Sequence, residues 1–153
     1  MFVAHLTSDG RITRPPFVWL AIPIELITAL GALPVGWSLM TDPSGSGMGL
    51  PSAWIAGSIL GTYFIPGIYL LLMNGLGMLV AVGLTLYRHW SAPWWTAVLA
   101  VGLIVWILVQ FALMPETSPL QWFFLASGLA LGFIALFWLR RTARLPASAP
   151  FNG

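Results

Sequence analysis

The chain lacks cysteine and lysine and carries little charge of either sign. Without cysteine, disulfides, thiolate metal sites, iron–sulfur clusters and a cysteine nucleophile are all excluded. Charged residues make up 7% of the 153 residues and hydrophobic residues 59%, whereas ordinary soluble domains are about a quarter charged. This charge is too small to cover a water-facing surface, so a soluble globular protein is excluded. The net charge of +2 does not indicate a nucleic-acid partner.

The sequence also lacks the usual sets of catalytic and metal-binding side chains. Asp9, Asp42 and Glu116 lie outside the apolar segments and no carboxylate pair or serine–histidine–acid set is evident. The histidines, His5 and His89, also lie outside those segments, and a transition-metal site normally takes three or four ligands. We therefore assign no catalytic residue, no metal ligand and no cofactor. A protein without enzymatic activity is expected, with an enzyme acting on a lipid or apolar molecule as the alternative.

Four long apolar segments dominate what is present. Each is long enough for the roughly 20 helical residues that cross a bilayer. The segments are continuous and show no period of two, which favours helices over barrel strands. The sequence predicts an all-α integral membrane protein, an antiparallel four-helix bundle within residues 17–139. The expected parts are an N-terminal tail at 1–16, spans at about 17–40, 60–86, 94–114 and 119–139, an outer loop at 41–59 and a C-terminal tail at 140–153.

Arginine and tryptophan predict the orientation of the bundle. Every arginine lies in one of the two tails or in the connection between the second and third spans. An even number of spans places these segments on the same side of the membrane. The residues are Arg11, Arg14, Arg88, Arg140, Arg141 and Arg144. The positive-inside rule makes that side cytoplasmic, so both termini are expected in the cytoplasm. Tryptophan prefers the headgroup level. Trp19, Trp90, Trp94, Trp95 and Trp138 fall at the predicted inner boundary, and Trp37, Trp54 and Trp122 at the outer one.

The first apolar segment contains an acid, Glu25. A cleaved signal peptide is one alternative, but a run of about 24 residues with an acid and two prolines is longer than the usual apolar region. Because an ionised carboxylate is costly in lipid, we expect Glu25 to be protonated and to donate a hydrogen bond, for example to Asn74 or to a free carbonyl. The alternatives are a pocket for a lipid-like ligand, proton or ion movement, and a position in the headgroups.

Small and polar residues recur at helical spacing and indicate the inward faces. The stripes are Ala21, Glu25, Thr28, Ala32 and Gly36; Gly67, Asn74, Gly77 and Ala81; Gln121, Gly128, Gly132 and Ala135; and Trp106 and Gln110 with Gly102 near them. Helix packing explains such stripes, and a lined cavity is the alternative. The candidate ligand-binding or interhelical polar residues are Glu25, Thr28, Asn74, Trp106, Gln110 and Gln121.

The loop "TDPSGSGMGLPSAWIAGS" is predicted to be a turn followed by a short interfacial helix. Asp42 can accept backbone hydrogen bonds in the turn, and Trp54 would anchor the helix. The loop has glycines but neither the lysine nor the flanking strand of a phosphate-binding loop. Nucleotide binding is therefore not expected.

Several short motifs resemble those of a known family. These are "DPSGSGMGLP" in the loop, "IPG" at 65–67, "VWILVQ" at 105–110 and "LQWFF" at 120–124. Over about residues 20–141 the chain resembles a family of small bacterial four-helix integral membrane proteins. The resemblance implies a bacterial origin, and with it the cytoplasmic (inner) membrane. It implies no activity and no catalytic residue.

Two functions remain as expectations. The first is a structural or accessory subunit of a membrane assembly, whose partners are membrane lipid and either other membrane proteins or further copies of the chain. The alternative is a binder of a lipid or small apolar ligand, with Glu25 and Asn74 in its pocket. A subunit of the first kind needs no sizeable cavity, whereas a binder needs an apolar pocket with Glu25 or Asn74 on its wall.

Overall fold

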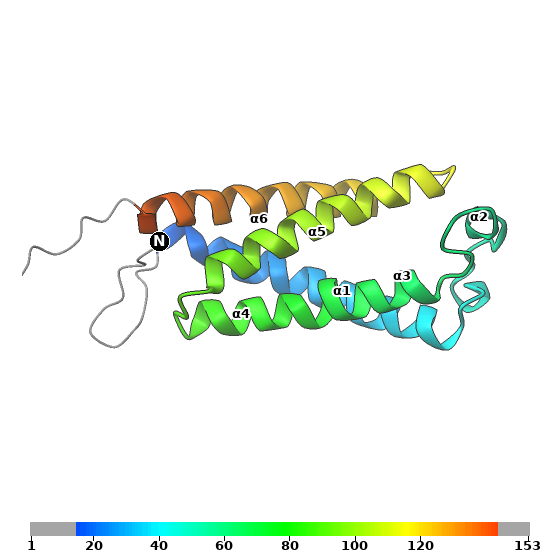
Figure 1. The fold of residues 1–153 in the computed structure, drawn as a ribbon, viewed down its shortest axis with the longest axis horizontal. Helices are drawn as coiled ribbons and strands as arrows, with labels where there is room; N and C mark the ends of the chain where they lie inside the picture. The colour runs from blue at the N-terminus through cyan, green and yellow to red at the C-terminus, as the bar shows by residue number, and fades with distance from the viewer. Residues whose placement is uncertain (1–14, 144–153) are drawn as a thin grey trace, which may run out of the picture.

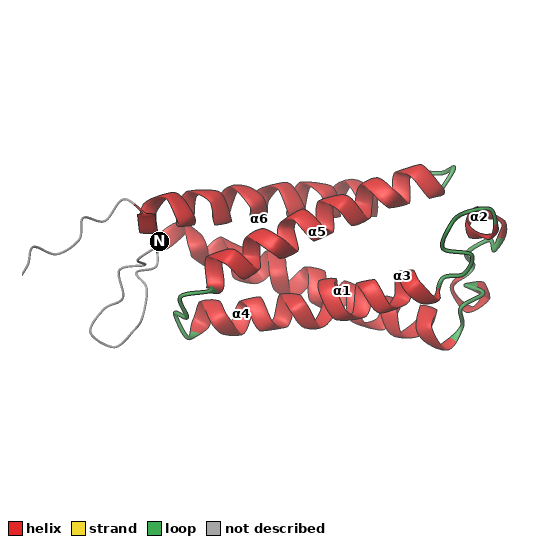
Figure 2. Cartoon of the chain, viewed as in Figure 1, coloured by secondary structure: helices red, strands yellow, loops and turns green. Residues whose placement is uncertain are grey.

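Four long apolar helices make up the described part of the chain, residues 15–143, in this computed structural model (Figures 1 and 2). Each is long and apolar enough to cross a membrane, and no strand occurs within residues 15–143. The predicted all-α four-helix bundle is therefore confirmed. The helices are η1 (Pro16–Leu20) with α1 (Ala21–Thr41), α3 (Phe64–Tyr69) with η3 (Leu70–Gly77) and α4 (Met78–Leu86), α5 (Ala92–Leu113), and α6 (Pro119–Ala143).

The helix ends differ from the expected ones for local reasons. The second helix begins at Phe64 and not at about 60, because the chain still turns at Gly61, whose φ is +64°. The third begins at Ala92, where Pro93 in the first turn suits a helix start. The fourth continues past 139 to Ala143, with Arg140 and Arg141 in its last turn, where cations favour the helix dipole. His5, Asp9, Arg11, Arg14 and Arg144 lie outside the described residues.

The helices form two pairs. α1 packs along α3, η3 and α4, and α5 packs along α6. The pairs lie close together at the end that carries Arg88, Arg140 and Arg141, which we call the arginine end, and they diverge toward the end that carries residues 42–63, the loop end (Figure 1). The first and last described residues both lie at the arginine end.

Small residues hold each pair together. All five members of the α1 stripe are buried, which confirms it as the inward face. At Gly36 an added Cβ would lie 2.6 Å from the backbone nitrogen of Leu71 and 2.9 Å from the carbonyl oxygen of Gly67, so α1 and α3 touch backbone to backbone. At Gly128 it would lie 2.9 Å from the side chain of Ile104 on α5. Glycine is needed at these contacts because any side chain would force the helices apart.

The arginine end is closed by a buried cluster. Val18, Ala92 and Trp138, from η1, α5 and α6, have no exposed surface. Trp138 lies at the end of the bundle where the sequence places it, but its side chain is buried between three helices. Trp19 and Trp90, by contrast, are about half exposed at this end.

A compact loop closes the opposite end. The carboxylate of Asp42 accepts hydrogen bonds from the amide of Gly47 (2.8 Å) and the hydroxyl of Ser46 (2.9 Å), and also from the hydroxyl of Ser44. Tyr63 donates from its hydroxyl to the carbonyl of Pro51 (2.9 Å). Between them lies the short helix α2 (Ala53–Ala56), where the sequence predicts one. The loop is thus tied to itself and to the start of α3.

Candidate functional site

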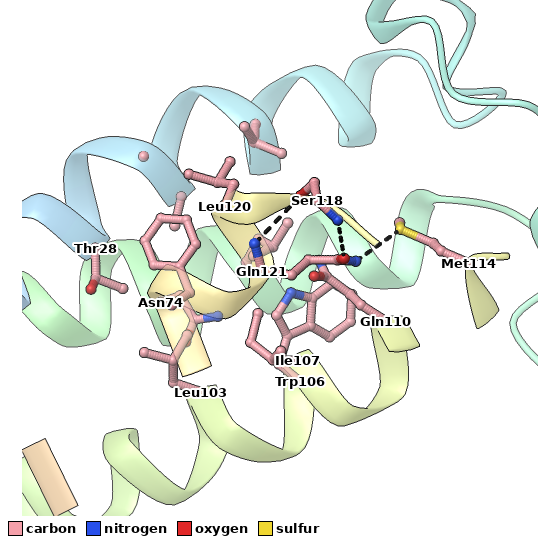
Figure 3. Close-up of a pocket in the computed structure, with 15 residues that line it drawn as sticks. Thr28, Asn74, Leu103, Trp106, Ile107, Gln110, Met114, Ser118, Leu120 and Gln121 are labelled. Carbon is pink, nitrogen blue, oxygen red and sulfur yellow. Dashed lines mark hydrogen bonds between the residues drawn. The ribbon is translucent and has the colours of Figure 1, made fainter. Parts of the chain in front are cut away.

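A cavity of about 370 Å³ lies between the two helix pairs, on the loop-end side of the bundle (Figure 3). α1, η3, α5 and α6 all contribute to its wall. Five of the six candidate residues are on that wall, although they come from four different helices: Thr28, Asn74, Trp106, Gln110 and Gln121. Thr28 and Asn74 lie at one extreme of the labelled side chains and Met114 at the other, so the cavity extends along the bundle (Figure 3).

A second cavity of about 200 Å³ adjoins the first toward the loop end. The two share wall residues, among them Val35, Leu70 and Trp106. Trp54 and Ile55 of α2 contribute to the far side of the second cavity, and Ile55 is 3% exposed. The outer loop therefore covers the opening that the diverging helix pairs would leave.

Asn74 is a buried polar group on the wall of the larger cavity, at the extreme away from Met114 (Figure 3). It lies within η3, a π-helical segment, and its side chain is 1% exposed. Neither Nδ2 nor Oδ1 has a hydrogen-bond partner among the described residues. π-helical turns are rare in proteins, but those that occur are often at functional sites. An unpartnered buried amide is costly, so each such group calls for an explanation.

Trp106 stands in the wall that the two cavities share. Its indole stacks on the ring of Tyr69, with centroids 5.2 Å apart and planes 24° apart. Tyr69 in turn donates a hydrogen bond to the carbonyl of Gly102 (2.8 Å), which fixes the stacked rings against α5. The indole Nε1 is buried and has no acceptor within the described part of the chain. The wall thus offers a second unused donor.

Gln121 has a structural role that the sequence analysis missed. Its Oε1 accepts from the backbone amide of Ser118 (2.9 Å), and the Ser118 hydroxyl accepts from the Gln121 amide (3.4 Å). This is a capping box, followed by Pro119 in the first helical position. "SPLQ" is the sequence signal for it. Gln121 Nε2 also donates to Met114 Sδ (3.5 Å), so this side chain joins the ends of α5 and α6 (Figure 3).

Glu25 lines neither cavity. The prediction that it bonds to Asn74 or to a free carbonyl is wrong. Its Oε1 accepts a hydrogen bond from the hydroxyl of Thr96 on α5 (2.8 Å), and the side chain has no exposed surface. The other oxygen, Oε2, has no partner among residues 15–143. The sequence analysis overlooked Thr96, although it is an isolated polar residue in the arginine-end half of the third apolar segment.

The electrostatics of the two cavities are simple. Among the described residues, no charged side chain lines either one. The outer loop carries the charged residue Asp42, outside the membrane spans. Hydrogen bonds from the Ser44 hydroxyl, the Gly47 amide and the Ser46 hydroxyl lower the pKa of Asp42 from 3.8 to about 2. The cavities therefore present an uncharged wall with a few hydrogen-bonding groups.

Comparisons with protein-family models, with curated proteins and with solved structures find no match to this chain. The resemblance to small bacterial four-helix membrane proteins therefore stays a prediction. Function has to be inferred from the geometry of the bundle and its cavities.

Proposed function

We propose that this multi-pass membrane protein binds a small apolar or lipid-like molecule in the cavity between its two helix pairs. The observation that carries the proposal is the buried, unpartnered amide of Asn74 on the wall of an apolar cavity of about 370 Å³. Ligand sites commonly have volumes of about 300–1,000 Å³ and mostly apolar walls with a few polar groups. The cavity fits that description.

The geometry favours a binder over a purely structural subunit. A subunit that serves only as a packing partner needs no sizeable cavity, and its helices can pack closely, as they do near Val18 and Trp138. At the loop end the pairs diverge, and the space between them is lined by residues of all four helices. The pocket does not include Glu25, so the expected pair of Glu25 and Asn74 is reduced to Asn74.

We also propose that the arginine end is cytoplasmic and that the membrane is the bacterial inner membrane. Arg88, Arg140 and Arg141 lie at one end of the bundle, and Asp42 and Glu116 lie in turns at the other. Positive charge favours the cytoplasmic side. A cytosol-active reporter fused after Arg144 should be active in a bacterial host. An inactive reporter at that site would contradict the orientation.

The binding proposal is tested by purification in a mild detergent followed by native mass spectrometry. We expect an apolar molecule to accompany the wild-type protein at a fixed ratio. Ala32→Phe places a ring in the cavity and should remove that molecule, whereas Ala126→Phe changes an exposed position on α6 and should retain it. Circular dichroism reports whether each variant is folded. Retention by folded Ala32→Phe, or no bound molecule in any sample, would contradict the proposal.

A further inference from the structure

We infer that the ligand is an uncharged amphiphile with a single apolar chain, whose head both donates and accepts hydrogen bonds, as the hydroxyl of a long-chain alcohol does. Its head lies against Asn74 and its chain extends toward the loop end. The inference rests on the proposed function and adds the chemical class of the ligand and its direction in the cavity.

The hydrogen-bonding capacity of Asn74 restricts the head of the ligand. A carboxamide offers two donors on Nδ2 and an acceptor on Oδ1. Both atoms are buried and unpartnered, and the side chain lies on the cavity wall. A head that only accepts, such as an ether, leaves Oδ1 unpaired, and an alkane leaves the whole amide unpaired. A hydroxyl can donate to Oδ1 and can accept as well.

The indole of Trp106 restricts the head of the ligand further. Its Nε1 is a donor without a partner in the same wall, and its ring is held by stacking on Tyr69. Indole is a donor only. The unused groups of the wall are therefore richer in donors than in acceptors. An oxygen with two lone pairs matches this set better than an ammonium or amine head.

The uncharged walls of the two cavities restrict the charge of the ligand. Within residues 15–143, the side chains on both cavity walls are uncharged, and the buried acid Glu25 is bonded to Thr96 elsewhere. An ionised head would lose its hydration with no countercharge to replace it. Phosphate, sulfate and carboxylate heads are therefore disfavoured.

The shape and volume of the two cavities restrict the apolar part of the ligand. Asn74 and Met114 lie at opposite extremes of the labelled side chains of the larger cavity (Figure 3). The second cavity, of about 200 Å³, adjoins the first toward the loop end, shares Trp106 with it and is lined on its far side by α2. The walls in that direction are mainly apolar, with residues such as Val35, Leu70 and Leu120 shared by both cavities. Together the cavities are in the range of about 300–1,000 Å³ that suits a small molecule. One chain fits this space, whereas a two-chain phospholipid exceeds it.

The test compares probes that share a chain and differ in the head. Dodecanol, dodecyl methyl ether, dodecane and dodecanoate at neutral pH would compete with radiolabelled dodecanol for the full-length protein in nanodiscs, with binding corrected for empty nanodiscs. We expect dodecanol to bind about tenfold more tightly than dodecane, since a hydroxyl can pair with both atoms of the Asn74 amide and an alkane with neither. The ether should lie between them, and dodecanoate should bind at least as weakly as dodecane.

Variants separate this inference from the proposed function. Asn74→Leu should reduce dodecanol binding to the level of dodecane, and Trp106→Phe should reduce it less. Thr85→Val is the matched control, because Thr85 is also buried and unpartnered but lies on neither cavity wall. Equal binding of dodecanol and dodecane, or a preference that survives Asn74→Leu, would overturn the inference while the proposed function stands. Failure of every probe to bind would overturn the proposed function itself.

Discussion

The two halves of the bundle differ in how their helices meet. At the arginine end, η1, α5 and α6 bury Val18, Ala92 and Trp138 completely. Toward the loop end the helix pairs diverge, and two cavities occupy the space that Trp106 divides. In the closed half, Val18, Ala92 and Trp138 fill the space between η1, α5 and α6. In the open half, α1, η3, α5 and α6 line a cavity, and α2 of the outer loop lies over the adjoining one.

The same contrast appears in the buried polar groups. Glu25 points toward α5 and reaches Thr96 at 2.8 Å. Asn74 lies where the pairs separate, and neither of its amide atoms has a hydrogen-bond partner within residues 15–143. A polar group in a close-packed region can find a partner on the next helix. In the open region the same kind of group stays available for a ligand.

The divergence occurs between the pairs and not within them. α1 stays bound to the second helix at the loop end, because Gly36 and Gly67 bring the two backbones together. This contact therefore holds α1 and the second helix in place where they line the cavity.

The largest effect is expected from Gly36→Leu. An added Cβ would lie 2.6 Å from a backbone nitrogen of the neighbouring helix, which cannot move aside as a side chain could. We expect a loss of about 3 kcal/mol in the free energy of unfolding. Gly83→Leu is the matched control, since nothing lies within 4 Å of a Cβ at that position. Reversible unfolding in mixed detergent micelles measures both, and equal losses would refute the backbone contact.

A smaller effect should separate the two halves directly. Ala21 and Ala32 lie on the same buried face of α1, but Ala21 is fully packed and Ala32 is on the cavity wall. Ala21→Leu should therefore destabilise the protein by about 1–3 kcal/mol through overpacking. Ala32→Leu should change the stability by less than about 1 kcal/mol, because the cavity accepts the added atoms. The reverse order in thermal unfolding would show that the cavity does not exist in the folded protein.

The Glu25–Thr96 hydrogen bond should contribute about 1 kcal/mol, the typical scale for such bonds between membrane helices. Thr96→Val removes the donor and leaves both carboxyl oxygens unpartnered, so it should be destabilising. In the double variant Glu25→Met/Thr96→Val neither polar group remains, and part of the loss should be regained. A double-mutant cycle of unfolding free energies measures the coupling. Strict additivity of the two substitutions would count against the bond.

The smallest effect concerns the loop that covers the cavity. Because the pKa of Asp42 is lowered from 3.8 to about 2, its carboxylate stabilises the folded loop fully above pH 3.8, and this contribution disappears as the pH falls toward 2. Asp42 is partly exposed in a loop outside the membrane spans, so the change should be local. Hydrogen exchange at the Gly47 amide should accelerate, relative to its intrinsic rate, over that pH range. Asp42→Asn should lose this pH dependence, and an unchanged profile in the variant would rule out the carboxylate as its cause.

The number and type of the helices, and the inward face of α1, could be predicted from the amino-acid sequence. Lipid requires the backbone to satisfy its own hydrogen bonds, so long apolar runs must be helices. Helical spacing then identified Ala21, Glu25, Thr28, Ala32 and Gly36 as one buried face. These properties depend on residues near one another in the chain, which a single sequence contains.

The residues that each inward face contacts depend on how the four helices pack together. Spacing placed Glu25 inside the bundle but could not pair it with Thr96, which lies 71 residues away. It did not anticipate the π-helical segment, which changes the helical register and buries Gly75 beside Asn74. The divergence of the pairs, and hence the cavity, depends on how side chains from four helices fit together. A periodic pattern fixes the direction of a side chain about its own helix axis, whereas the distance to the neighbouring helix is set by the residues on both.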